Sequence, residues 1–309
     1  MGETMKQEKG FGVFIAAWAY ILWGILPVYW KMIEQVPPLE ILSHRVIWSF
    51  FFVSAVVLFT KRDLLKKFLQ DQIKEKKTIM GLMLASFFIS INWLTYIFAV
   101  NTGHIVDASL GYYINPLVVV LLGVFVLREK LNFWQTTSFV LAGVGVIYMT
   151  VSIGKFPWIA VILAVSFGLY GLSKKLIKVD AALGLLLETL FISPFALGFL
   201  VYLAVNGQQS FLSGSLHNNL FLMGTGIATS LPLLLFGIGA QRIPLYMVGL
   251  LQYIAPTISL ILGVLMYGEP FTRDHMITFA CIWTAIAIFT LSNLKGRVKR
   301  KKTAPLSQE

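Results

Sequence analysis

Three ionisable residues lie inside apolar runs of the sequence, where such side chains are costly and usually serve a function. Glu188 lies two helical turns into one run, and burial disfavours its charged form, so it could exchange a proton. The alternative is a structural bond to a neighbouring helix. His44 could carry a proton or only pack. Arg45 could bind an anionic solute or a helix carbonyl, or extend its side chain to the membrane surface.

Aromatic and amide side chains in the same runs could bind an amphipathic solute. Tyr and Trp combine apolar faces with a polar group, and Asn and Gln both donate and accept hydrogen bonds. The alternative for each is a hydrogen bond between helices, worth about 0.6 kcal/mol on average. The candidates for a solute site are Asn92, Trp93, Tyr96, Tyr112, Tyr113, Asn115, Gln252 and Tyr253.

Motifs for catalysis, nucleotide binding and metal binding are not found in the sequence. It contains no GxxxxGK[ST] loop, no HExxH motif and no signature of a paired-aspartate or activated-serine site. Cys281 is the single cysteine, which excludes an intrachain disulfide, and no Cys/His cluster offers a zinc site. We therefore expect no cofactor, no metal and no enzyme activity, with an intramembrane enzyme as the less favoured alternative.

The elements that must position these residues are predicted to be membrane-spanning helices. Of the 309 residues, 57% are hydrophobic and 13% are charged, and the mean hydropathy is +0.79. The apolar runs of about 18 to 25 residues suit helices that cross a bilayer and lack the polar alternation of barrel strands. We predict an all-α integral membrane protein with ten spans, at residues 10–30, 39–60, 78–100, 108–127, 133–151, 156–173, 181–205, 219–239, 245–267 and 275–293.

The placement of the basic residues predicts the topology. Of the 25 Lys and Arg, 21 fall on the side of the predicted spans that carries both termini, and only Lys31, Lys155 and Arg273 fall on the other. The positive-inside rule therefore predicts cytoplasmic termini and a multi-pass protein of the cytoplasmic membrane. The net charge of +11 follows this topology and gives no indication of nucleic-acid binding. Residues 61–77 and the tail 295–302 should contact anionic lipid, the former through an amphipathic helix.

Some residues at the ends of the spans have simpler predicted roles. Asp107 should cap the span that follows it. Glu129 and Glu269 precede spans five and ten, where a carboxylate favours the positive end of a helix. Three tryptophans near span ends should anchor the protein at the membrane interface; these are Trp18, Trp30 and Trp158.

An internal repeat relates the two halves of the chain. LGYYINP (110–116) aligns with LLQYIAP (250–256) at an offset of 140 residues, and eight of the twenty positions from 110 to 129 are identical. Spans one and two match spans six and seven at an offset of 144, which pairs Gly24 with Gly168. The repeats cover residues 1–152 and 153–294, and the tail 295–309 follows them. Because each repeat has five helices, an odd number, the two repeats must cross the membrane in opposite orientations. Inverted repeats are typical of secondary transporters, although a channel or a lipid scramblase could share the duplication.

The matched prolines of the repeat, Pro116 and Pro256, each remove a backbone donor from mid-span. In a membrane such a defect is tolerated where protein or a water-filled cavity satisfies the free carbonyl. We therefore expect these prolines to act as kinks or gating points, or else only to shape the packing of helices.

Several segments in combination resemble the RarD family of EamA-type permeases, within the drug/metabolite transporter superfamily. They are EILSHRVIWS (40–49), NWLTYIFAVNTGH (92–104), ASLGYYINPLVVVLLG (108–123), FGLYGLSKK (167–175), PLLLFG (232–237), LQYIAPT (251–257) and YGEPF (267–271). The resemblance covers nearly the whole chain. The chain departs from the expected pattern at Asp107, where a Glu is expected.

The resemblance implies a bacterial permease of two EamA repeats, with a central cavity lined by the first four helices of each half. The fifth and tenth helices should pack outside this cavity. Together with the repeat, it predicts a transporter of a small metabolite or drug-like solute, working as a proton-coupled exporter by alternating access. The resemblance implies no settled substrate. A homodimer is a possible assembly.

Overall fold

The computed structural model of the chain describes residues 2–70, 75–102, 105–154, 156–213, 215–268 and 272–302. Every regular element in these ranges is a helix, as the composition predicts. In chain order the helices are α1 (Gly2–Lys31), α2 (Pro38–Thr60), α3 (Arg62–Gln70), α4 (Lys76–Asn101), α5 (Ile105–Phe125), α6 (Phe133–Ile153), α7 (Trp158–Leu176), α8 (Ala181–Val205), α9 (Leu216–Arg242), α10 (Leu245–Leu251), α11 (Ile254–Tyr267) and α12 (Arg273–Lys302).

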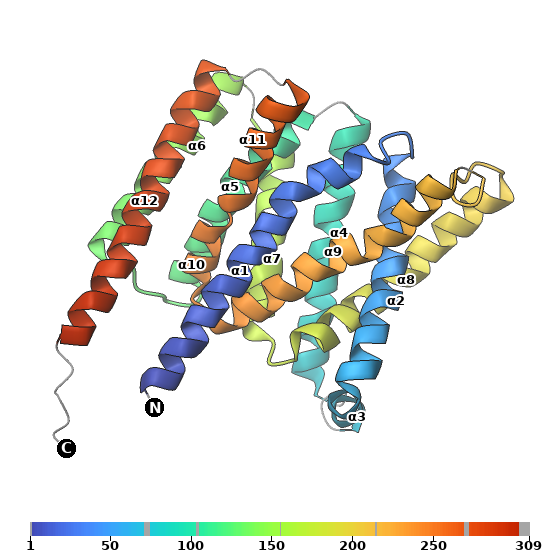
Figure 1. The fold of residues 1–309 in the computed structure, drawn as a ribbon, viewed down its shortest axis with the longest axis horizontal. Coiled ribbons are helices and arrows are strands. Elements are labelled where there is room, and N and C mark those ends of the chain that lie inside the picture. The colour runs from blue at the N-terminus through green and yellow to red at the C-terminus, as the bar shows by residue number, and fades with distance from the viewer. Residues whose placement is uncertain are drawn as a thin grey trace.

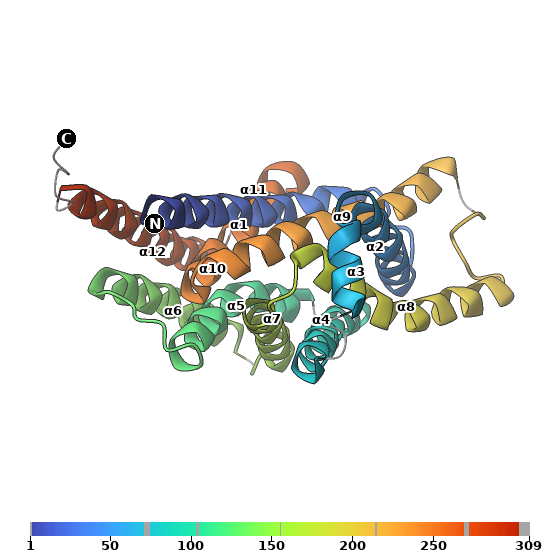
Figure 2. The same ribbon diagram turned by 90° about the horizontal axis from the view of Figure 1, so that it is seen from below.

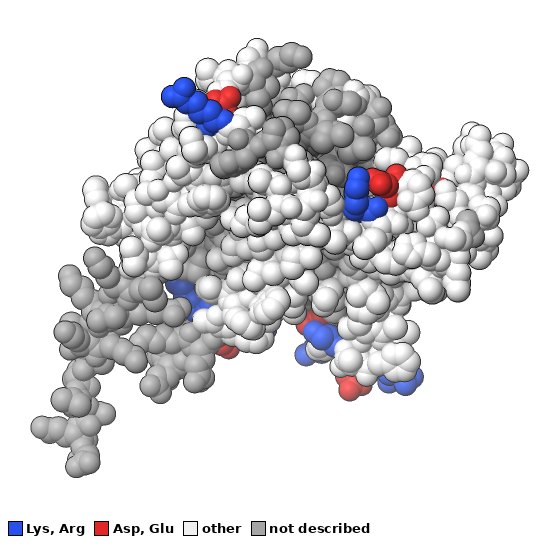
Figure 3. Space-filling view, turned by 45° about the horizontal axis from the view of Figure 1, so that its top comes forward, with Lys and Arg blue, Asp and Glu red and all other residues white. Residues whose placement is uncertain are grey.

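The helices are long and apolar enough for the predicted membrane spans. Nine segments of the described chain could cross a bilayer by their length and composition, and α5 adds the shorter apolar helix Leu110–Phe125. Together they correspond to the ten predicted spans. On the face seen in Figure 3, a band without Lys, Arg, Asp or Glu separates the charged side chains at the top from those at the bottom.

Local sequence signals set the ends of several helices. Asn132 caps α6 by accepting from the backbone N–H of Gln135, whose side chain accepts from the Asn132 N–H in return. At the other end of α6, Gly154 adopts the left-handed conformation with φ of 70°. Asp180 caps α8 by accepting a single hydrogen bond from the N–H of Ala182 at 3.0 Å.

The ninth predicted span is interrupted, which the hydropathy pattern does not indicate. Residues Gln252 and Tyr253 form a turn that separates α10 from α11. Pro256 has no N–H, so the Gln252 carbonyl lacks its usual donor four residues later and instead accepts from the N–H of Ala255 at 3.2 Å. At the matching position of the first half, α5 runs continuously through Pro116.

The basic segment after α2 forms a helix, as predicted, over Arg62–Gln70. Phe68 of this helix is buried in the protein core, while Leu64 and Leu69 are exposed. The apolar side chains of this helix therefore point partly into the protein core and partly outward. Residues 71–74, including Ile73, lie outside the described chain. Helices α1 and α12 begin and end, respectively, at the same edge of the bundle as α3 (Figure 1).

The helices pack in pairs around the middle of the bundle. Helix α1 packs on α9 and α11, and α7 packs on α4 and α5. Helix α2 contacts α8 near one end of the bundle, and α6 lies beside α12 at the other end (Figures 1 and 2). Two glycines allow close contacts in this arrangement: a Cβ on Gly24 would lie 2.7 Å from Cβ of Ile258, and one on Gly168 would lie 3.0 Å from Cγ1 of Val118.

Candidate functional site

A central cavity of about 590 Å³ occupies one half of the bundle. Its described lining comes from the second halves of α1 and α4, the first halves of α5 and α7, the middle of α9, Gln252 and the whole length of α11, with one residue each from α2, α6 and α12. These positions run from mid-bundle to the edge that carries Trp30, Tyr267 and His275, opposite the edge where α1 begins. The volume lies within the range of about 300–1,000 Å³ that is typical of small-molecule sites.

Arg45 projects from α2 into the cavity wall. Its guanidinium carbon lies 4.8 Å from the ring centroid of Trp30 and 5.6 Å from that of Trp93, and its Nε donates to the Thr229 hydroxyl at 2.9 Å. The side chain therefore turns inward and does not extend to the membrane surface. Trp30, predicted as an interface anchor, instead lines the cavity beside Arg45, whereas Trp18 and Trp158 are exposed.

The predicted solute-binding residues gather around this cavity, with one exception. Seven of the eight candidates line it: Asn92, Trp93, Tyr96, Tyr112, Tyr113, Asn115 and Gln252. Tyr253 does not; it is fully buried, and its hydroxyl donates to the Tyr113 carbonyl at 3.3 Å. Asn92 also has a structural role, because its amide donates to the Leu163 carbonyl at 2.9 Å and to the Ser166 hydroxyl at 3.1 Å.

Three polar side chains gather at the deep end of the cavity. The side-chain oxygen of Asn115 is buried without a hydrogen-bond partner, whereas the Tyr20 hydroxyl and the side-chain amide of Gln252 lie close enough to interact with each other. All three residues line the cavity. Buried polar groups in folded proteins usually have partners, so the Asn115 oxygen and the remaining hydrogen-bonding capacity of the Gln252 amide are available to a solute or water.

The helical prolines are linked to the same cavity. Pro27, Pro116 and Pro256 each withhold the N–H that would bond the carbonyl four residues earlier. Those earlier residues, Trp23, Tyr112 and Gln252, all line the cavity. Pro116 itself is buried outside the lining, whereas Pro27 and Pro256 belong to it.

Five aromatic residues close the cavity at mid-bundle. Tyr20, Trp23, Phe167, Tyr170 and Phe236, here called the aromatic floor, pack together with ring centroids 5.4–6.2 Å apart. Tyr20, Trp23 and Phe167 face the cavity, while Tyr170 and Phe236 lie further along α7 and α9, toward the edge where α1 begins. No residue of α8 lines the cavity within the described chain.

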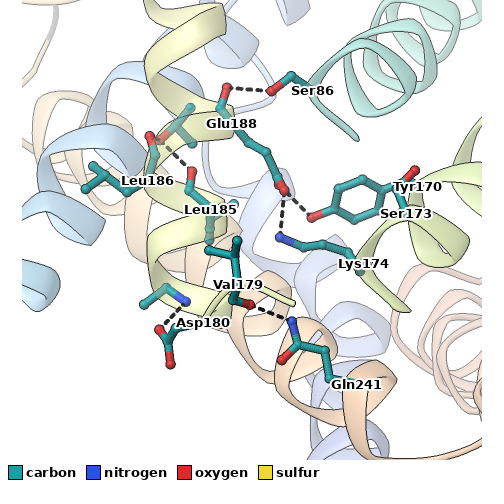
Figure 4. Close-up of polar contacts among 12 residues, drawn as sticks. Ser86, Tyr170, Ser173, Lys174, Val179, Asp180, Leu185, Leu186, Glu188 and Gln241 are labelled. Atoms are coloured by element: carbon teal, nitrogen blue, oxygen red, sulfur yellow. Dashed lines mark hydrogen bonds and ion pairs between the residues drawn. The ribbon is translucent and has the colours of Figure 1, made fainter. Parts of the chain in front are cut away.

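Glu188 lies beneath the aromatic floor, in a buried ion pair. Its carboxylate accepts from the Lys174 ammonium at 2.7 Å and from the Tyr170 hydroxyl at 3.1 Å (Figure 4). Lys174, counted with the loops in the topology prediction, is only 3% exposed. Tyr170 therefore joins the floor to the ion pair, because its ring stacks on Phe236 while its hydroxyl bonds Glu188.

His44 and Glu40 form a separate buried group near the opposite edge. The Glu40 carboxylate is fully buried and accepts from the Ser210 N–H at 2.6 Å, the Ser210 hydroxyl at 2.9 Å and the Phe211 N–H at 3.1 Å. His44 packs its ring 4.8 Å from that of Phe211 and has Nε2 3.9 Å from Glu40. His44 does not line the cavity, so its surroundings favour a packing role.

Glu129 caps a different helix from the one predicted. Its two carboxylate oxygens accept from the N–H groups of Leu245 at 2.7 Å and Tyr246 at 2.9 Å, at the start of α10. The start of α6 is instead capped by Asn132. Glu129 thus joins the end of the first half to the second half. The Asp107 side chain and Glu269, which have the other predicted capping roles, lie outside the described residues.

Some residues around Arg45 and Glu188 were not predicted from the sequence. Thr229 and Lys174 carry ordinary polar groups that no local pattern distinguishes, and Trp30 was predicted only as an interface anchor. The signal for Lys174 was its position, because only Ser173 separates it from the apolar run of α7. Among the described residues, no group of three or more His, Cys, Asp or Glu could hold a metal ion.

Comparison with known proteins adds independent evidence. The family model for the EamA-like transporter family matches residues 10–151. The uncharacterized transporter YojE of Bacillus subtilis is 49% identical over 96% of this chain and 97% of its own, and Protein RarD of Escherichia coli is 41% identical over 96% and 99%. One crystal structure shares the fold with a TM-score of 0.69 and 20% identity, over 91% of this chain and 97% of that one.

Proposed function

The chain belongs to the RarD family of EamA-like transporters, and from this premise we propose that it is a secondary carrier of a small solute that works by alternating access. Membership of this family and the apolar helices make it a multi-pass membrane transporter. The bacterial relatives support a place in the cell membrane.

The observation that carries the proposal is a cavity that reaches only one edge of the bundle. Its described lining ends at the aromatic floor, and the floor is backed by the buried pair of Glu188 and Lys174. A carrier exposes its site to one side at a time. A channel would instead need a continuous path, which the packed floor does not provide in this conformation. The cavity therefore favours a carrier over a channel.

The packing of the helices supports two rocking halves. In the predicted repeat, α1 matches α7, α4 matches α9, and α5 matches α11. A two-fold axis therefore requires that the contact of α1 with α9 recur between α7 and α4, and that the contact of α1 with α11 recur between α7 and α5. Both contacts occur. Gly24 and Gly168 match at an offset of 144, and the residues they meet, Ile258 and Val118, match at 140. We propose that residues 1–152 and 153–294 are these halves.

The coupling group in this proposal is the ion pair of Glu188 and Lys174. Protonation of Glu188 would remove the negative charge that holds Lys174. It would also weaken the hydrogen bond that Glu188 accepts from Tyr170 of the aromatic floor. With both termini cytoplasmic, as the basic residues predict, the cavity faces outward. In this state Glu188 lies behind the aromatic floor, so it would exchange its proton only after the two halves rock. Export driven by the proton gradient is the direction we propose.

Transport by purified protein in liposomes tests the proposal. The probes are amino acids, aromatic acids and chloramphenicol, each radiolabelled, with an imposed proton gradient. We expect at least one solute to accumulate against its own gradient and to be lost when a protonophore is added. Saturation and exchange with unlabelled solute would identify a carrier. Downhill flux that ignores the protonophore, or lipid scrambling without a solute, would contradict the proposal.

A further inference from the structure

Arg45 carries a charge that no carboxylate neutralises among the described residues. The ion pairs of the described chain join Lys31 to Glu34, Lys61 to Asp180, Lys174 to Glu188 and His44 to Glu40. None includes Arg45. It is also the only Lys, Arg, Asp or Glu among the described residues that line the cavity. The part of the cavity wall that the structure describes therefore presents one uncompensated positive charge.

The surroundings of Arg45 hold its guanidinium but leave part of it unused. Trp30 and Trp93 flank the cation, and Thr229 accepts one hydrogen bond from Nε. No hydrogen bond joins the two terminal nitrogens to any residue that the structure describes. These nitrogens form the planar fork that binds a carboxylate through two parallel hydrogen bonds. The position of Arg45 within a span makes an idle charge costly, which favours a role in binding.

The rest of the cavity fits the body of an organic acid. Tyr96 and Tyr112 lie near enough to Arg45 to interact with its charge, and Tyr112 is 52% exposed within the cavity lining. Trp23 and Phe167 supply apolar surface further in, and the side-chain amide of Gln252 lies beside Tyr20 at the deep end. An acid group at Arg45 would thus place an aromatic or apolar body against the floor.

Charge balance narrows the class of solute. One guanidinium neutralises one negative charge, so a monoanion leaves the filled cavity uncharged, whereas a dianionic phosphate would leave a net charge in the membrane interior. The fork of Arg45 matches a carboxylate in shape.

We propose that the cavity binds an organic monocarboxylate with an aromatic or apolar body, its carboxylate bound by Arg45 between Trp30 and Trp93. This inference rests on the proposed carrier function and names the substrate class of the same site. Arg45 selects the acid, Trp30 and Trp93 hold its guanidinium in place, and Gln252 with Asn115 bonds any polar group at the far end of the solute.

Matched acids and amides test the proposal by thermal stabilisation of the purified full chain. The probes are phenylacetate with phenylacetamide, and indole-3-acetate with indole-3-acetamide, because each pair differs mainly in charge. A ligand that binds the folded protein raises its apparent melting temperature. We expect each acid to bind at least about tenfold more tightly than its amide, since charge-assisted bonds are the stronger ones.

Three variants assign the effect to Arg45. Arg45→Gln should abolish the preference for the acid, and Arg45→Lys, which keeps the charge without the fork, should weaken acid binding by about tenfold. Lys31→Gln is the matched control, because Lys31 is an exposed cation at the end of α1, next to Trp30. It should leave the preference unchanged. Should Arg45→Gln fail to fold, Arg45→Lys carries the comparison.

Equal stabilisation by acid and amide, no stabilisation by any acid, or an acid preference that survives in Arg45→Gln would each overturn the proposal. Its failure is separable from that of the carrier function. If a neutral or cationic solute is transported in liposomes while acids do not bind, the carrier function stands and the substrate class is wrong. If no solute is transported, the carrier function itself fails.

Discussion

Glu188→Gln should lower the free energy of unfolding by about 3–5 kcal/mol, because it leaves the buried ammonium of Lys174 without its counter-charge. The neutral amide can still accept a hydrogen bond but supplies no charge. The measurement is reversible unfolding in mixed detergent micelles. Glu34→Gln is the matched control, since its pair with Lys31 is exposed and should be worth less than about 1 kcal/mol.

The double variant Glu188→Leu with Lys174→Met separates stability from coupling. Replacing a buried pair with apolar residues is often neutral or stabilising, so this variant should unfold at nearly the wild-type free energy. It has no group at this position to exchange a proton, so solute movement should no longer follow the proton gradient. Wild-type coupling in this variant would show that Glu188 is not the coupling group. A wild-type stability for Glu188→Gln would show that the pair is not ionised.

Gly226→Ala should disrupt the packing of α9 on α2. A Cβ at this position would lie 2.4 Å from the carbonyl carbon and 2.5 Å from the carbonyl oxygen of Trp48. Backbone atoms cannot rotate away, so the two helices must separate, and the hydrogen bond from the Ser49 hydroxyl to the Gly226 carbonyl would lengthen. We expect a loss of about 3 kcal/mol or more, or failure to accumulate in the membrane.

Gly198→Ala is the control for this substitution, because Gly198 lies in the interior of α8 with nothing within 4 Å of the added Cβ. It should be neutral or slightly stabilising, as alanine has the higher helix propensity. Membrane-inserted yield and the melting temperature of the two variants, purified in parallel, give the comparison. Similar behaviour of the two would mean that α2 and α9 do not approach as closely as described.

The helical fold and its apolar spans could be predicted from hydropathy, because the bilayer imposes helix length and composition directly. Hydropathy does not indicate the interruption between α10 and α11, because residues 245–267 still read as one span; only Pro256 predicts a kink there. The seven candidates that line the cavity could be picked out because amide groups are costly within a span and because Tyr and Trp combine an apolar face with a polar group.

What the sequence missed depends on which helices meet. Trp30 near a span end suits a lipid interface equally well, and only the inward turn of Arg45 draws it to the cavity. Glu129 precedes α6 but bonds the start of α10, a contact set by tertiary packing. The partner of Glu188 likewise depends on the approach of α7 to α8, which no local pattern encodes.

The side from which the cavity is accessible tests the central claim most directly. In a Cys281→Ser background, Tyr112→Cys places a thiol on the cavity wall, and Lys67→Cys on α3 marks the edge that carries the termini. A membrane-impermeant maleimide is added to intact cells and to inside-out vesicles. We expect the Tyr112→Cys protein to be labelled at least about tenfold faster in cells than in vesicles, and the Lys67→Cys protein to be labelled only in vesicles. Equal labelling of the cavity thiol from both sides, or labelling from the vesicle side alone, would contradict it.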